Sequence, residues 1–460
     1  MSKLERTTFE FSRAREYFEL KELSTLTGQE PETFAAVVLK ELVDNALDGC
    51  EMAGVAPHIT VEVDSDVTPD DGDIRMSITD NGGGIPPEVV AKVLDYNIRV
   101  SDKSAYRSPT RGAQGNALKA VVGIPHALGG REPIVIEGRG VHHEIRPWID
   151  PAGAVRIEHE ESPSSLTEGT RVTVALPVGK QFFDPLHWVR SFALFNPHAT
   201  LIYHGECEGE KVSDSYKSTG DRFKKYHPSE PTSPHWYTHE NLATLIFAYV
   251  GAAKNGGRDV PLGEFLRQFK GLTSTKKAKA VASAFAHIRY LSDFEDHQQD
   301  IPFLLKSMQD ATKAPRHEAI GLVGPEHFEN VFRRLYEVEE FNYTKVKSYL
   351  PSGLPYSFEA ALAVTSSPGH LYCGINFSPA FGDPLEGTLL AGPEFKAHGI
   401  RGFLSRGRVL PQSYVWSESP TNTAMAVHIV TPAPIYLDKG KTRIQMETHR
   451  QEEEVAKRGR

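Results

Sequence analysis

The feature that most constrains the fold is a polar strip on a predicted helix at residues 33–50, TFAAVVLKELVDNALDGC. The apolar residues of this segment follow the i, i+3, i+4, i+7 spacing of an amphipathic helix: Ala35, Val38, Leu39, Leu42 and Ala46. At about 100° per residue, Glu41, Asn45 and Asp48 share one strip, with Asp44 beside them. Acids this close repel one another, so the strip costs stability unless a cation or basic groups lie near it. The alternative interpretation is an acidic face exposed to solvent.

A glycine-rich segment follows a predicted strand. Residues 74–79, IRMSIT, alternate apolar and polar as a half-buried strand does, and they run into Asp80, Asn81 and three glycines at 82–84. Glycine has no side chain and permits positive φ, so a flat ligand can lie close to this backbone while Asp80 accepts a hydrogen bond from an exocyclic amine. Adenine fits that description. The alternative is a turn that only joins two elements.

A polar segment, SDKSAYRSPTRGAQGNALKAVVG, begins at residue 101 and has no hydrophobic period until a helical run starts at Ala117. This pattern is typical of a lid that enters the N-terminus of a helix. Backbone N–H groups freed by Gly112 and Gly115 can hold the β- and γ-phosphates of a nucleotide there. Three basic side chains are candidate charge partners for those phosphates: Lys103, Arg111 and Lys119.

The order of these pieces is more specific than any one of them. The chain carries E-x-x-x-N-x-x-D on a helix, D-x-G-x-G after a strand, a glycine-bounded lid, and Gly169-Thr170 before an alternating strand at 171–177. This ordered set resembles the GHKL (Bergerat-fold) ATPase superfamily. The P-loop alternative fails, because no G-x-x-x-x-G-K-[ST] is present. The resemblance implies an α/β sandwich that binds ATP and Mg²⁺ and hydrolyses the nucleotide.

The resemblance also implies a role for individual residues. Glu41 is the expected general base that orients the attacking water, Asn45 is the expected Mg²⁺ ligand, and Asp80 is the expected reader of adenine. The other residues expected to bind the nucleotide lie on the same helix, in the glycine loop, in the lid and before the strand at 171–177: Asp48, Gly82, Gly84, Lys103, Arg111, Gly112, Gln114, Gly115, Asn116, Ala117, Lys119 and Thr170.

Within this superfamily the chain most resembles the B-type component of topoisomerase VI, a type IIB enzyme. A sensor kinase would need a phosphoacceptor histidine upstream of the asparagine helix, but only 40 residues precede Glu41 and the first histidine is His58. Other ATP-driven clamps, namely type II topoisomerases, MutL proteins, large cytosolic chaperones and MORC proteins, share the pocket. The lid of this chain is similar to the topoisomerase VI lid, which ends in Arg-Gly-x-Gln-Gly: Tyr96, Ser101, Lys103, Arg111, Gly112, Gln114 and Gly115.

The same resemblance predicts the domain organisation. Residues 1–232 are the expected ATP-binding domain with an N-terminal strap at 7–23. Residues 233–325 resemble a helix-two-turns-helix insert, residues 326–445 resemble an α/β transducer, and 446–460 form a short charged tail. Transducers of this class bring one lysine to the γ-phosphate. Lys441 is the candidate and Lys439 the less favoured one, and a solvated basic turn is the alternative.

Composition narrows the partners and the location. With 51 Lys and Arg against 60 Asp and Glu, the net charge is −9, so any DNA contact must be local. Basic runs at 222–225, 276–279 and 401–408 are candidates, and each is also an ordinary solvated surface. No secretory signal and no run near the roughly 18 apolar residues of a membrane span is visible, so we expect a cytoplasmic, nucleoid-associated protein without membrane contact.

The combined expectation is an ATP-gated homodimer that captures double-stranded DNA for strand passage. DNA cleavage would belong to a separate A-type subunit with a Toprim domain and a nucleophilic tyrosine. The alternative is an ATP-gated clamp or scaffold that cuts nothing and acts in genome maintenance or phage defence. The ending METHRQEEEVAKRGR, soon after the expected transducer, favours this alternative.

Overall fold

The computed structural model describes residues 13–65, 72–96, 105–111, 117–177, 179, 181–207, 210–220, 225–227, 229–350, 353–367, 369–382, 384, 422–437 and 444. The chain forms two compact units. Unit 1 comprises Met1–Val100, Gly115–Arg190 and Ala199–Lys217, and unit 2 comprises Ser101–Gln114, Ser191–His198 and Ser218–Arg460. Among the residues described, no helix is long and apolar enough to cross a lipid bilayer.

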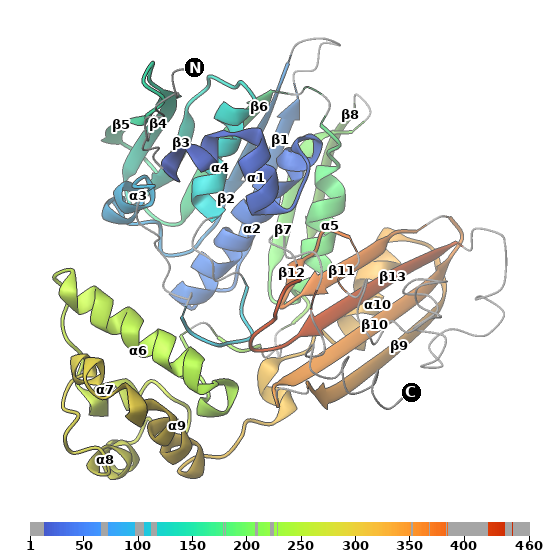
Figure 1. Cartoon of the computed structure of the whole chain (residues 1–460). Helices are drawn as coiled ribbons and strands as arrows, with labels where there is room; N and C mark the ends of the chain where they lie inside the picture. The colour runs from blue at the N-terminus through green and yellow to red at the C-terminus, as the bar shows by residue number, and fades with distance from the viewer. Residues whose placement is uncertain are drawn as a thin grey trace, which may run out of the picture. The chain divides into compact units, whose positions relative to one another are not determined.

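An eight-stranded sheet forms the base of unit 1, in the order β5-β4-β3-β6-β2-β1-β7-β8 (Figure 1). Neighbouring strands are antiparallel except β1 and β7, which are parallel. Along β3 the buried Ile134 and Ile136 alternate with the half-buried Val135 and Glu137, so one face of the sheet is covered. The strands are β1 (His58–Ser65), β2 (Asp73–Thr79), β3 (Ile134–Gly138), β4 (Val141–Ile149), β5 (Val155–Pro163), β6 (Thr170–Pro177), β7 (Thr200–Cys207) and β8 (Glu210–Tyr216).

Helices cover that face, and Figure 1 shows α1, α2 and α4 lying over it. The helical elements are η1 (Arg13–Phe18), α1 (Leu20–Thr27), η2 (Pro31–Thr33), α2 (Phe34–Ala53), α3 (Pro87–Val93), α4 (Ala117–Ala127) and α5 (Pro185–Phe195), the last of which enters unit 2 at Ser191. All five apolar residues that predicted the helix at 33–50 are buried in α2. The predicted α/β sandwich is therefore confirmed, as are the strand before Asp80, the helix from Ala117 and the strand after Gly169.

Unit 2 contains a five-stranded sheet in the order β12-β11-β13-β10-β9. Every residue of β13 is buried, as expected of a central strand with both faces covered. The helix α10 (Pro325–Leu335) packs on β9 and β10. The strands predicted from residue 355 onward are present: β10 (Pro355–Thr365), β11 (Leu371–Ile375), β12 (Ser378–Pro379) and β13 (Thr423–Val430), joined by β9 (Val338–Tyr349).

A helical segment of unit 2 occupies the region predicted to be an insert. Its helix α6 begins at a capping box in which Thr238 and Asn241 satisfy each other's backbone N–H groups. Its core includes the buried aromatic side chains of Trp236, Phe265 and Phe294. The elements are η3 (Pro234–Trp236), α6 (His239–Lys254), α7 (Leu262–Leu266), α8 (Thr275–Ser283), η4 (Leu291–Glu295), η5 (Gln298–Asp300), α9 (Ile301–Asp310) and η6 (His317–Ile320). The helices are confirmed, and the division into insert and transducer stays a prediction.

A buried carboxylate organises the sheet of unit 2. Glu359 on β10 is fully buried and accepts four hydrogen bonds, from the backbone N–H groups of Val323 and Gly324, the hydroxyl of Tyr343 and Nδ1 of His428. Nε2 of His428 accepts the N–H of Phe377 at 3.0 Å, which leaves Nδ1 to face Glu359. Burial alone would raise the pKa of Glu359, but the His428 bond and the two N–H groups hold it below its usual value.

Replacing Glu359 by alanine is expected to lower the free energy of unfolding of unit 2 by about 3–5 kcal/mol, because it leaves buried donors without an acceptor. Native-state hydrogen exchange of β10 and β13 peptides in increasing urea measures this loss. The control is Glu339→Ala on the exposed side of β9, which should change stability by less than about 0.5 kcal/mol. Equal exchange in the two variants would contradict the proposed role of Glu359.

Candidate functional site

The polar strip predicted on α2 includes its own basic partner. Asp44 is buried, Glu41 and Asp48 are half-buried, and Asn45 is exposed. The Lys40 ammonium lies 2.9 Å from a carboxylate oxygen of Asp44 and 3.9 Å from one of Glu41. Lys40 therefore relieves the repulsion between neighbouring acids. The sequence analysis missed this residue, although its i, i+4 spacing from Asp44 is a recognisable signal.

The glycine loop packs directly against α2. A Cβ on Gly82 would lie 2.8 Å from the carbonyl carbon of Gly49 and 3.0 Å from the nitrogen of Cys50, so only glycine allows this contact. Gly169 has φ 74°, and a Cβ there would lie 1.9 Å from the carbonyl oxygen of Asp80. The N–H of Gly169 donates to the carbonyl of Gly82 at 2.9 Å. Two glycines far apart in the sequence thus let three backbone segments meet beside Asp48.

Asn81 anchors the same loop to the turn that follows α2. Its Oδ1 accepts the N–H of His58 at 2.8 Å, and its Nδ2 donates to the carbonyl of Ala56 at 3.1 Å. The Cys50 thiol donates to the same Oδ1 at 3.2 Å. Burial, with Asp80 nearby, raises the pKa of Cys50 to about 12, so this cysteine stays a protonated thiol.

Asp80 joins the end of β2 to the start of β6. Its Oδ1 accepts the N–H of Gly82 at 2.7 Å and the N–H of Thr170 at 3.2 Å, and its own N–H donates to the carbonyl of Thr170 at 2.9 Å. Burial raises the pKa of Asp80 to about 6, and the bonds from Gly82 and Thr170 only partly oppose that rise. The structure therefore brings together three predicted site residues. A carboxyl that titrates near neutrality in a buried setting is typical of a functional position.

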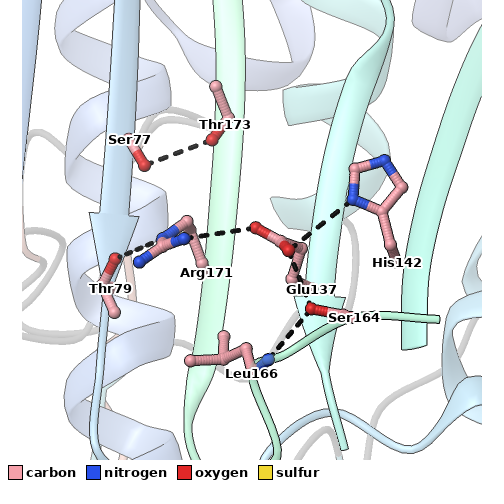
Figure 2. Close-up of polar contacts among 8 residues, drawn as sticks. All are labelled: Ser77, Thr79, Glu137, His142, Ser164, Leu166, Arg171 and Thr173. Atoms are coloured by element: carbon pink, nitrogen blue, oxygen red, sulfur yellow. Dashed lines mark hydrogen bonds and ion pairs between the residues drawn. The ribbon is translucent and has the colours of Figure 1, made fainter. Parts of the chain in front are cut away.

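A polar network on the face of the sheet opposite the helices holds β2, β3, β4 and β6 together. Figure 2 shows Glu137 at its centre, accepting from Ser164 at 2.8 Å and from Arg171 at 3.4 Å, with His142 at 3.6 Å. Arg171, next to Thr170, also donates to the hydroxyl of Thr79 at 3.1 Å. The pKa of Glu137 is lowered because these partners outweigh its partial burial. The network ties β2, β3, β4 and β6 together where Asp80 and Thr170 are held.

Lys119, one of the three predicted phosphate partners, lies in the first turn of α4 and is buried. Its ammonium donates to the carbonyl of Asp95 at 2.6 Å and lies 5.4 Å from the ring centre of Tyr96. The Tyr96 hydroxyl donates in turn to the carbonyl of Lys119 at 3.2 Å. Burial lowers the pKa of Lys119. Its predicted contact with a phosphate is untested.

Arg111, the second predicted partner, belongs to unit 2 and is only 1% exposed. Its guanidinium donates to Oδ1 of Asn196, and its Nε donates to the carbonyl of Phe377 at 3.4 Å. Asn196 donates to the same carbonyl at 2.9 Å. In this structure the Arg111 guanidinium contacts neutral oxygens inside unit 2, and its predicted phosphate contact stays a prediction.

Tyr106 and Arg107, in the segment predicted to be a lid, contact the helical segment of unit 2. The Tyr106 hydroxyl donates to Gln268 at 2.8 Å. Arg107 donates from its side chain to the carbonyl of Trp236 at 3.2 Å and from its N–H to the Tyr237 hydroxyl at 2.9 Å. Seven predicted site residues lie outside the described residues: Lys103, Gly112, Gln114, Gly115, Asn116, Lys439 and Lys441. Of Ala117, only the backbone is described.

Arg139 is a second residue that the sequence analysis missed. It occupies the turn between β3 and β4 with φ 51°, and its Nε donates to the carbonyls of Gly83 and Gly84, at 3.1 Å each. The arginine thus holds the outer side of the glycine loop. The signal available in the sequence was the E-G-R-G turn between two alternating segments, which says where the chain turns but not which loop the arginine reaches.

The chain is similar in sequence to known proteins. Residues 31–180 match the family of histidine kinase-, DNA gyrase B-, and HSP90-like ATPases. The B-type component of type 2 DNA topoisomerase 6 from Natronomonas pharaonis is 31% identical over 216 residues, which cover 45% of this chain and 25% of that protein. Its counterpart from Thermococcus kodakarensis is 24% identical over 288 residues, 60% of this chain and 48% of that protein.

The ATPase region of Saccharomyces cerevisiae topoisomerase II superposes on 89% of this chain and 76% of that chain, with a TM-score of 0.38 and 8% identity. The chain spans less than half the length of the two topoisomerase 6 relatives. Residues 31–180 therefore match the histidine kinase, DNA gyrase B and HSP90 (GHKL) ATPase family, and the chain is similar to the B-type components of topoisomerase VI.

Proposed function

We propose that unit 1 binds ATP with Mg²⁺ and hydrolyses it, with adenine read by Asp80. The observation that carries this proposal is the buried Asp80 carboxylate, fixed on Gly82 and Thr170 beside the polar strip of α2. Two backbone N–H groups occupy Oδ1, and the carboxylate keeps acceptor capacity on Oδ2 for an exocyclic amine. Gly82 leaves no side chain between this carboxylate and a flat base.

The strip on α2 supplies the groups that phosphoryl transfer requires. Asn45 is exposed and offers an amide oxygen, a ligand type that Mg²⁺ accepts alongside phosphate oxygens and water. Glu41, one helical turn earlier, is positioned as the general base that orients the attacking water. Lys40, 3.9 Å away, brings a positive charge to this strip. Phosphoryl transfer depends mostly on positioning and charge neutralisation, and an amide, a carboxylate and an ammonium are the types of group that it requires.

We further propose that ATP closes a homodimer gate on double-stranded DNA, while a separate A-type, tyrosine-bearing subunit cuts the DNA. Similarity to the B-type components of topoisomerase 6 supports this assignment. Nucleotide binding that is complete only in the dimer shifts the monomer–dimer equilibrium by mass action. A non-cleaving clamp would use the same gate, and ATP-dependent relaxation of supercoiled DNA with the A-type subunit would distinguish the two.

Replacing Glu41 by alanine is expected to lower kcat for ATP hydrolysis by about 100-fold or more and to leave nucleotide affinity within about threefold, because the base acts on the water rather than on the bound ground state. Steady-state ATPase assays and calorimetric titration with a non-hydrolysable analogue measure the two quantities. Glu62→Ala, on the exposed side of β1, is the matched control. Normal hydrolysis by the Glu41 variant would refute this role.

The affinity for nucleotide is expected to fall as the pH drops below about 6, because only ionised Asp80 accepts the adenine amine. With a pKa of about 6, binding at pH 5 should be about tenfold weaker than at pH 7. Calorimetric titration with ADP and Mg²⁺ between pH 5 and 8 tests this dependence. Asp80→Asn should lose most of the affinity, whereas Asp73→Asn, exposed at the start of β2, should keep the wild-type profile. A pH-independent affinity would rule out Asp80 as the reader.

A non-hydrolysable ATP analogue with Mg²⁺ is expected to convert the purified chain from monomer to dimer. Light scattering coupled to size-exclusion chromatography measures the mass directly. Asn45→Ala should stay monomeric under the same conditions, because it lacks the expected Mg²⁺ ligand. If wild type binds the analogue but its mass does not change, the proposal of an ATP-gated dimer is wrong, while the proposed nucleotide site is not contradicted.

A further inference from the structure

Three potential metal ligands lie together on β4 and β5, outside the residues of the proposed nucleotide site. The strand register places Glu161 directly opposite His143, and His159 lies two residues before Glu161 on the same face of β5. Nδ1 of His143 is 2.9 Å from Nε2 of His159 and 3.4 Å from Oε1 of Glu161. The third side of the triangle, from Nε2 of His159 to Oε1 of Glu161, is 3.8 Å.

These separations match one face of a zinc tetrahedron. Zinc binds histidine nitrogen and carboxylate oxygen at about 2.0–2.2 Å, so two ligand atoms at the tetrahedral angle lie about 3.3–3.4 Å apart. The three observed distances lie on either side of that value. A shift of about 0.5 Å in each of two separations would therefore place all three atoms at bonding distance from one ion.

The packing of the two histidine rings orients their nitrogens toward the position that the ion would occupy. The His143 side chain is 1% exposed, and its ring stacks on that of His159 with centroids 5.1 Å apart and planes at 29°. Nε2 of His143 is buried and has no hydrogen-bond partner, so the polar contacts of this ring lie on the Nδ1 side. Glu161 is about half-exposed, which leaves the ion reachable from solvent. Burial thus fixes one ligand, while the other two can adjust.

A second group, formed by His287, His297 and Asp300, is less suited to hold an ion. Its His287 side chain is 48% exposed and lies 2.6 Å from Asp300, much closer than the roughly 3.3–3.4 Å expected between two zinc ligands. Each of these side chains must give up more freedom to bind an ion than His143 does. This group serves as an internal comparison.

We propose that His143, His159 and Glu161 bind one zinc-type divalent transition-metal ion, with water completing its coordination. Two imidazoles and a carboxylate suit Zn²⁺ and its neighbours in the first transition row, whereas Mg²⁺ prefers all-oxygen sites, so this ion is distinct from the nucleotide's Mg²⁺. The ion ties β5, the strand at the edge of the eight-stranded sheet, to β4. An edge strand has only one neighbour to hold it, so a cross-link there stabilises the strand where it is weakest.

The test is calorimetric titration of the untagged, EDTA-treated full chain with Zn²⁺ in excess Mg²⁺, together with thermal melting. Wild type should bind one Zn²⁺ at this site and gain melting temperature. His159→Ala and Glu161→Gln should each weaken that binding by at least about tenfold and lose the gain. His142→Ala, on β4 but on the other face of the sheet, and His297→Ala, in the second group, should keep both.

Melting of the metal-free variants shows whether they fold, and the buried His143 is left unchanged for that reason. Zinc binding that persists in both His159→Ala and Glu161→Gln would overturn the proposal. Loss of binding in His297→Ala alone would move the site to the second group, and the absence of any binding by wild type would exclude the site altogether. None of these outcomes depends on ATP hydrolysis, so they test this site separately from the proposed function.

Discussion

The architecture of the candidate site depends on one carboxylate that accepts hydrogen bonds from the backbone of two separate segments. Asp80 accepts from Gly82 within its own loop and from Thr170 at the start of β6, and its N–H returns a bond to Thr170. Glycines at 82 and 169 allow the approach, because any side chain there would collide with backbone. Burying a carboxyl is costly unless it is hydrogen-bonded. The raised pKa of Asp80 shows that its hydrogen bonds offset only part of the free-energy cost of burying the ionised carboxylate.

Unit 2 uses a buried carboxylate in the opposite way. Glu359 is hydrogen-bonded on all sides, and its pKa is lowered rather than raised. Its partner His428 holds the N–H of Phe377, a residue with φ 68°, and the carbonyl of that residue accepts from Asn196 and Arg111. Glu359 therefore has the properties of a structural residue, whereas the raised pKa of Asp80 is consistent with the adenine-binding role proposed for it.

Periodicity and glycine spacing predicted the elements of the site well. The helix at 33–50, the strand before Asp80 and the strand after Gly169 could be predicted because their apolar residues repeat locally, every three to four residues in the helix and every two in the strands. The contacts of Lys40 with Glu41, of Asn81 with the turn after α2 and of Arg139 with the glycine loop were missed. The contacts of Asn81 and Arg139 depend on which segments meet in space, which the local pattern does not contain, whereas the i, i+4 spacing of Lys40 and Asp44 was visible in the sequence. The hydrogen bonds of Arg111 illustrate the same limit, because its local sequence does not indicate its partners in unit 2. Its phosphate contact stays a prediction.

The two units are interleaved along the chain, with residues 101–114 and 191–198 of unit 2 inserted between stretches of unit 1. During synthesis these two segments leave the ribosome before the body of unit 2, which starts at residue 218. Tyr106 and Arg107 must then wait for Gln268, Tyr237 and Trp236 before they acquire their hydrogen-bond partners. A chain cut after residue 217 would contain the eight-stranded sheet and would keep the bond of Arg111 to Asn196, but Tyr106 and Arg107 would lose Gln268, Tyr237 and Trp236. The gene therefore cannot be divided into two halves that each retain their own contacts.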